Sequence, residues 1–293
     1  MNHLSKRKLW VSWGLLLLLS LIWGSSYILI KRGLVAFEPL QVAAIRLTIS
    51  AITFFPIFLF VRKDVDWSKW RFLLLTGLTG NALPALLFAI AQTRLSSSLT
   101  GVLNSLTPLF TLVLAIIIFK LPFQRNKGIG VLIGFLGAFL LAWFGKDSGA
   151  ASDPWYVIFV VLGGVCYAIS SNTVASKLKD SSSMVISAAS FMMLLPGAFF
   201  LFFYSDVTHT LTTHAASWSS FGYITILAII GTVLASILYY QLVHFTGAVV
   251  SSFVSYLVPF VATMWGVVDG EPITIFSMIG MVLILAGVYI ARK

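Results

Sequence analysis

The sequence predicts an all-α polytopic membrane protein, and three observations support this prediction. Hydrophobic residues make up 59% of the 293 residues and charged residues only 10%, whereas a soluble domain is about half apolar and roughly a quarter charged. The apolar residues form runs close to the ~20 residues that a helix needs to cross the hydrocarbon core of a bilayer. Lysine and arginine are concentrated in alternate connections between these runs, as expected for a multi-pass protein.

Ten apolar runs qualify as predicted membrane-spanning helices. The turns around Thr93–Leu121 and between the last two runs are short, so a count of nine spans stays open. In chain order the predicted spans are Leu9–Ile30, Leu40–Val61, Trp70–Ala91, Ser98–Phe119, Lys127–Phe144, Trp155–Val174, Met184–Tyr204, Phe221–Val243, Ala248–Val268 and Ile273–Ala291.

The first run follows a basic cluster (Lys6, Arg7 and Lys8) and therefore resembles a signal peptide at its start. It continues to about Ile30, however, and has no small-x-small cleavage pattern in a polar setting. We therefore predict that it is retained as the first transmembrane helix.

The distribution of positive charge predicts cytoplasmic N- and C-termini. With the N-terminus inside, every lysine and arginine falls on the inner side except Lys31, Arg32, Arg46, Arg94 and Lys146. This bias is the positive-inside rule. The net charge of +10 is then a consequence of topology, so we expect a lipid bilayer and a small molecule as partners and no nucleic acid.

Two halves of the chain share a spacing of proline and glycine. The first half has Pro108, Pro122, Gly130 and Gly137, and the second has Pro259, Pro272, Gly280 and Gly287. The turn around Pro122 is basic, whereas its counterpart around Pro272 is acidic. Five spans are an odd number, so two such units in tandem have opposite orientations. We predict two inverted five-helix repeats at 1–147 and 148–293, an arrangement typical of secondary transporters.

Several motifs resemble one family. They are Leu21-Ile22-Trp23-Gly24-Ser25-Ser26, Ala43-Ala44-Ile45-Arg46-Leu47, the stretch from Ser251 to Pro259, Gly270-Glu271-Pro272 and the stretch from Gly280 to Gly287. Together they resemble the EamA-type branch of the drug/metabolite transporter superfamily. The resemblance implies ten helices, a central cavity, alternating access and export or exchange of small metabolites, often amino acids. Lys120 stands where the second half has Glu271, which departs from the pattern.

Arg46 is the one charged side chain well inside a predicted span. Charges at membrane depth are rare and mark functional sites by default. Arg46 could bind a substrate carboxylate or hold an outer gate closed. Alternatively, its long side chain could extend to the outer interface, which lies about six residues away.

Other midspan polar and aromatic residues are candidates for a substrate pocket, because such a pocket needs apolar walls and a few directed hydrogen bonds. The alternative for each is packing between helices. Together with Arg46, the predicted substrate-binding residues are Trp23, Ser26, Tyr27, Asn81, Asn104, Tyr167, Asn172, Ser252, Ser255 and Tyr256.

Pro108 and Pro259 occupy matching positions in the two halves. Proline removes a backbone donor and can bend a helix. We predict that the pair acts as hinges beside the cavity, with static kinks as the alternative.

The sequence contains no motif for embedded catalysis, metal binding or a cofactor. We expect no enzyme and no cofactor. No aspartate or glutamate falls within a predicted span, which favours facilitated diffusion or exchange over a proton-carrying carboxylate. The expected function is export or exchange of small metabolites by a monomer in the cell (inner) membrane, with amino acids as the first substrate class. Nucleosides, sugars or organic cations stay open as substrates, and a channel or an embedded enzyme is the alternative outside transport.

Overall fold

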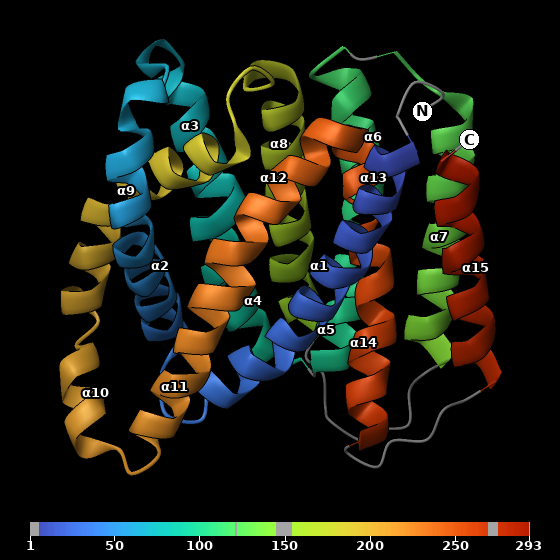
Figure 1. Cartoon of the computed structure of the whole chain (residues 1–293). Coiled ribbons are helices and arrows are strands. Elements are labelled where there is room, and N and C mark those ends of the chain that lie inside the picture. Colours follow the sequence, from blue (N-terminus) through green and yellow to red (C-terminus); the bar gives the residue numbers. More distant parts are fainter. Residues whose placement is uncertain (1–5, 96, 121, 145–153, 269–274, 293) are drawn as a thin grey trace.

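A computed structural model of the chain describes residues 6–95, 97–120, 122–144, 154–268 and 275–292. All regular secondary structure within these ranges is helical, which confirms the predicted all-α class (Figure 1). By length and apolar composition, six of the described helical segments could each cross a membrane on their own.

The first half begins with two long helices and then divides into shorter ones. A π-helical turn, η3 (Leu78–Ala82), joins α3 to α4. The helices are α1 (Lys6–Gly33), α2 (Pro39–Val61), α3 (Trp70–Gly77), α4 (Leu83–Gln92), α5 (Ser97–Asn104), α6 (Thr107–Ile117) and α7 (Arg125–Phe144).

The second half follows the same plan with one addition, the short helix α10 (Val207–Thr213). A second π-helical turn, η5 (Ile229–Leu234), joins α11 to α12. The other helices are α8 (Val157–Lys177), α9 (Ser183–Tyr204), α11 (Ser217–Ala228), α12 (Ala235–Thr246), α13 (Ala248–Ser251), α14 (Val254–Val268) and α15 (Ile275–Arg292).

Helix lies over each of the ten predicted ranges, but two of these ranges contain a break. The predicted fourth span is divided into α5 and α6, and the predicted ninth into α13 and α14. The apolar stretches found in these two ranges, Thr107–Ile117 and Ala248–Val261, are shorter than the six segments above. The number of times that the chain crosses a membrane therefore stays a prediction.

The break before α6 follows from Pro108. Proline has no N–H to donate to the carbonyl four residues earlier, which belongs to Asn104. The Thr107 hydroxyl donates to that carbonyl instead, at 2.7 Å from the Asn104 oxygen. Proline suits the first turn of a new helix, where its missing N–H would have no partner in any case, and α6 begins one residue before Pro108.

The helices of the two halves pack in matching pairs. Helix α7 packs along α15, and α2 along α9. Helix α1 contacts α11, α12 and α14, and α8 makes the corresponding contacts with α3, α4 and α6. Pairs of this kind are what two related halves would make. The boundary that we predict at 147/148 lies outside the described residues, as does the acidic turn with Asp269 and Glu271.

The contact between α7 and α15 depends on glycine. A Cβ added at Gly287 would lie 2.6 Å from both the Gly130 oxygen and the Gly134 nitrogen. Two backbones come this close only where side chains are absent, as in small-residue interfaces of membrane helices. Gly130 and Gly287 both belong to the matching Pro-Gly patterns of the two halves.

The beginning of α1 and the end of α15 lie at the same end of the bundle, together with the connections from α2 to α3 and from α8 to α9 (Figure 1). Helix α10 lies at the opposite end. The predicted topology places both termini on one side of the membrane in the same way, while its assignment of that side to the cytoplasm stays a prediction.

Candidate functional site

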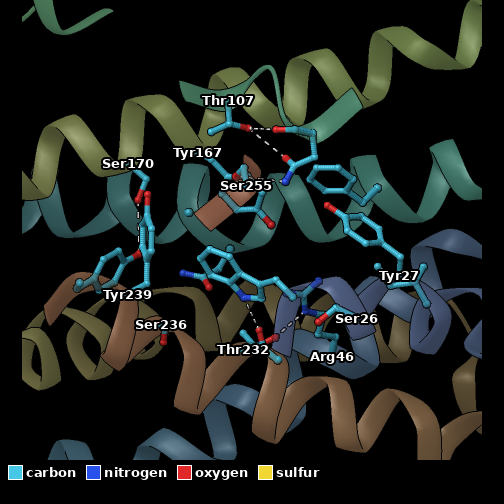
Figure 2. Close-up of a pocket in the computed structure, with 18 residues that line it drawn as sticks. Ser26, Tyr27, Arg46, Thr107, Tyr167, Ser170, Thr232, Ser236, Tyr239 and Ser255 are labelled. Carbon is cyan, nitrogen blue, oxygen red and sulfur yellow. Dashed lines mark hydrogen bonds between the residues drawn. The ribbon is translucent and has the colours of Figure 1, made fainter. Parts of the chain in front are cut away.

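A cavity lies between the two halves. The cavity has a volume of about 50 Å³, and one water needs about 10–15 Å³, so the cavity has room for several waters or a small solute. Its walls are formed by Trp23, Ser26, Tyr27, Ile30, Arg46, Gly80, Asn81, Phe88, Asn104, Thr107, Tyr167, Ser170, Gly231, Thr232, Ser236, Tyr239, Tyr240 and Ser255 (Figure 2).

Both π-helical turns contribute to the wall. Turn η3 contributes Gly80 and Asn81, and η5 contributes Gly231 and Thr232. A π-helical turn widens the helix, shifts one residue out of the usual register and occurs often at functional sites. In η5 the shifted register leaves the Gly231 carbonyl as an acceptor for the Trp23 indole nitrogen, 3.1 Å away.

Arg46 lies in the cavity wall and is only 8% exposed. Its Nε donates to the Thr232 hydroxyl at 2.7 Å, a hydrogen bond that Figure 2 shows. No carboxylate in the described ranges pairs with Arg46, because the ion pairs found there join Lys69 to Asp66 and to Asp180. The side chain therefore does not extend to the outer interface, and the charge stays inside the bundle.

Six aromatic rings form a continuous row along the cavity. Adjacent ring centroids are 5.0–6.2 Å apart, the range of favourable aromatic pairs. The Trp23 ring stacks on Tyr167 at 15° between planes, near the middle of the row. In order, the rings belong to Tyr27, Phe88, Tyr167, Trp23, Tyr239 and Tyr240.

The helices beside the breaks in the predicted fourth and ninth spans add a cluster of polar side chains to the wall. Thr107 shares its one hydroxyl hydrogen between the Asn104 carbonyl and the Asn104 side-chain oxygen, which is 3.1 Å away, and the Asn104 amide nitrogen donates to Ser255 at 3.4 Å. The Asn81 amide nitrogen is different, because it is buried and makes no hydrogen bond of 3.5 Å or less to an acceptor among the described residues.

The cavity brings together eight of the eleven predicted substrate-binding residues: Trp23, Ser26, Tyr27, Arg46, Asn81, Asn104, Tyr167 and Ser255. Whether any of them contacts a substrate stays a prediction, because their position alone does not test binding.

The other three predicted residues, Asn172, Ser252 and Tyr256, lie outside the cavity wall. The Asn172 amide bonds to the carbonyls of Thr111 and Ala168, and the Ser252 hydroxyl bonds within its own turn to the Val249 carbonyl. The Tyr256 hydroxyl donates to the Val131 carbonyl at 2.7 Å. The hydrogen bonds that these three side chains make all connect or stabilise helices, so the packing alternative describes their positions. The Asn172 Oδ1 is buried and has no hydrogen-bond partner among the described residues.

The sequence did not single out several wall residues. Thr232, Ser236, Tyr239 and Tyr240 share one face because residues three, four and seven apart align on a helix. The two adjacent tyrosines were the available signal. The other wall residues that we did not predict are Ile30, Gly80, Phe88, Thr107, Ser170 and Gly231.

Neither predicted hinge proline forms part of the cavity wall. Pro108 lies in the first turn of α6, and Pro259 lies inside α14. A hinge movement at these residues stays a prediction.

We expect Gly80→Ala to destabilise the fold around the cavity. The added Cβ would lie 2.6 Å from the Ser170 hydroxyl oxygen and 2.7 Å from that of Tyr240, so these side chains must shift. Overpacking of this kind costs about 1–3 kcal/mol. Thermal unfolding of the purified variant should show a lower midpoint than wild type. Gly197→Ala is the control, because an added Cβ there meets no atom within 4 Å, and an equal midpoint for Gly80→Ala would contradict the close contact.

Comparison with known proteins agrees with this geometry. The model of the EamA-like transporter family matches residues 10–143 and again 154–292. An uncharacterized transporter of Archaeoglobus fulgidus is 24% identical over 287 residues, covering 96% of this chain and 98% of the relative. The uncharacterized inner membrane transporter YedA of Escherichia coli strain K12 is 26% identical, covering 96% of this chain and 90% of the relative. A crystal structure with 20% identity shares the fold, with a TM-score of 0.66 over 98% of this chain and 97% of that one.

Proposed function

This chain belongs to the EamA-like transporter family, and on that premise we propose that it is a secondary transporter for small metabolites that carry a carboxylate and an apolar body. The carboxylate in this proposal rests on the position of Arg46. This residue is a buried cation in the cavity wall with a neutral hydroxyl as its hydrogen-bond partner. A guanidinium binds carboxylates by two parallel hydrogen bonds, and the row of aromatic rings offers an apolar surface beside it.

Alternating access fits the position of the cavity. Its walls come from both halves, which make matching contacts, and the family model matches each half separately. In transporters built from two related halves, the substrate binds between them and one half moves against the other. We propose the same arrangement here, with two inverted five-helix units.

The proposed location is the cell (inner) membrane, which is where the name of the relative YedA places that protein. We propose exchange or facilitated diffusion as the mode of transport, because no aspartate or glutamate lines the cavity in the described part of the chain. Amino acids, the class expected from the sequence, carry a carboxylate and are the first group to test.

Counterflow in liposomes tests the proposal. Purified protein is reconstituted into vesicles loaded with an unlabelled carboxylate, and uptake of the labelled compound is measured over a range of concentrations. We expect saturable uptake that is trans-stimulated by the internal compound. Flux that rises linearly with concentration would indicate a channel instead, and saturable uptake confined to nucleosides or organic cations would overturn the carboxylate class.

Trp23→Ala should reduce this counterflow at least about tenfold. The substitution removes a ring that contacts both Tyr167 and Tyr239, and it removes a hydrogen bond to Gly231. Truncation of a packed aromatic residue also lowers the free energy of unfolding by about 3–5 kcal/mol, so rates are compared per amount of folded protein. Trp23→Phe retains most of the ring surface and should recover part of the rate. Trp218→Phe is the control, because Trp218 is 70% exposed at the end of the bundle. Counterflow unchanged in Trp23→Ala would contradict a central pocket.

A further inference from the structure

The cavity wall carries one formal charge. Arg46 is the only lysine, arginine, aspartate or glutamate among its lining residues, all of which belong to the described part of the chain. Nε is bonded to Thr232, and a guanidinium has four further N–H groups on its two terminal nitrogens. The ionisable neighbours of Arg46 are Tyr167, which is close enough to accept a hydrogen bond from the guanidinium, and Tyr27, and a phenol is neutral at physiological pH.

The single positive charge of the cavity wall favours a monoanionic carboxylate over a zwitterionic amino acid. A charge in a buried site is costly unless an opposite charge compensates it. A monoanion bound at Arg46 brings the net charge of the occupied cavity to zero. A zwitterionic amino acid leaves it at plus one and adds an ammonium group, for which the cavity wall provides no carboxylate.

The second observation is Asn81, which is 6% exposed and lines the same cavity. Its Nδ2 is buried and makes no hydrogen bond of 3.5 Å or less to an acceptor among the described residues, and the Tyr240 hydroxyl is the neighbour close enough to interact with it. Buried donors are satisfied in nearly all proteins, by the protein, by water or by a ligand. Asn81 is held in this position by η3, whose neighbouring residue Gly80 has no side chain and so lets the Ser170 and Tyr240 hydroxyls lie close to the turn.

We propose that the substrate is a monoanionic carboxylate with an apolar body and a second acceptor oxygen, and that zwitterionic amino acids bind less tightly. The carboxylate binds the terminal nitrogens of Arg46, and the second oxygen accepts from Asn81 Nδ2. The aromatic row around Trp23 and Tyr167 contacts the apolar body. This inference rests on the proposed function and narrows its substrate class from carboxylates in general to those without an ammonium group.

Three probes of one carbon skeleton test the proposal in the reconstituted protein. 4-Methyl-2-oxopentanoate is a monoanion with a second acceptor oxygen, 4-methylpentanoate is a monoanion without one, and leucine is the zwitterion. Half-saturating concentrations in counterflow are compared at neutral pH. We expect the oxo acid to half-saturate at a concentration at least tenfold lower than leucine, with 4-methylpentanoate between them.

The Asn81→Leu variant separates the two parts of the proposal. In this variant the oxo acid and 4-methylpentanoate should half-saturate at the same concentration, and both concentrations should stay below that of leucine. Asn126→Leu, at an exposed position of α7, is the control and should behave as wild type. Asn81→Ala gives the same comparison without added bulk if the leucine variant does not fold, as judged by monodisperse elution in detergent.

The outcomes that would overturn the inference are distinct from failure of the proposed function. Leucine that half-saturates at the same concentration as the oxo acid, or a lower one, would disprove the preference for a monoanion while leaving carboxylate transport intact. An oxo-acid advantage that survives in both Asn81 variants would disprove the role of Asn81. Saturable transport of nucleosides or organic cations, with none of the three probes exchanged, would overturn the carboxylate class itself.

Discussion

Replacing Arg46 by glutamine should reduce the apparent affinity for a transported carboxylate about 10- to 100-fold. Charge-assisted hydrogen bonds contribute roughly 1.5–3 kcal/mol each, and about 1.4 kcal/mol corresponds to a factor of ten in affinity. Glutamine can still bond to Thr232 but carries no charge. Arg46→Lys keeps the charge without the planar pair of donors and should fall between wild type and Arg46→Gln, because a lysine binds a carboxylate as a point charge.

The Arg46→Gln variant should keep the thermal stability of wild type. Wild-type Arg46 is a buried charge without a paired carboxylate among the described residues, and removing a poorly compensated charge is often neutral or stabilising. Counterflow measured beside the thermal unfolding midpoint therefore distinguishes binding from a structural role. Arg94→Gln, at an exposed site after α4, is the matched control. If Arg46→Gln lowered the midpoint and kept the affinity of the surviving folded protein, Arg46 would be a structural residue.

Gly287→Leu should have the largest effect on stability. Even a Cβ at this position would overlap the backbones of Gly130 and Gly134, so α15 must move away from α7 over their whole contact. Overpacking costs about 1–3 kcal/mol where side chains can adjust, and here the neighbouring atoms belong to the backbone and cannot turn aside. We expect a loss of at least about 3 kcal/mol, seen as aggregation during detergent extraction or a much lower unfolding midpoint.

A second glycine substitution shows whether the effect of Gly287→Leu is specific. An alanine Cβ at Gly222 of α11 meets no atom within 4 Å, and alanine favours helix by about 1 kcal/mol over glycine. Gly222→Ala should therefore match or exceed the stability of wild type. A Gly287→Leu protein that elutes and unfolds like wild type would contradict the close contact of the two helices.

The positions of the helices could be predicted from the sequence because long apolar runs and basic turns depend on composition alone. The ends of α2 and α9 agree closely with the predicted spans Leu40–Val61 and Met184–Tyr204. The π-helical turns could not be predicted. Each differs from α-helix by one residue of register, and nothing in the composition of Leu78–Ala82 or Ile229–Leu234 marks that difference.

The position of a residue along its helix was predictable, whereas the direction of its side chain was not. Ser252 and Ser255 belong to one predicted span, yet the turn between α13 and α14 places only Ser255 at the cavity. In soluble helices an apolar stripe indicates which face is buried. Membrane-spanning helices are apolar on nearly every face, so Asn172 and Tyr256 could be placed in the middle of their predicted spans but could not be assigned to a face.

The two hydrogen bonds that end on η5 have a consequence for the energetics of ligand binding. Trp23 and Arg46 belong to the first half of the chain, and their acceptors Gly231 and Thr232 are consecutive residues of the second. The carboxylate proposed on the terminal nitrogens of Arg46 leaves both hydrogen bonds in place, whereas a ligand oxygen that takes either hydrogen displaces an acceptor of the opposite half. Binding of such a ligand and the contact between the halves are thermodynamically linked, so that a looser contact between the halves raises the affinity for that ligand.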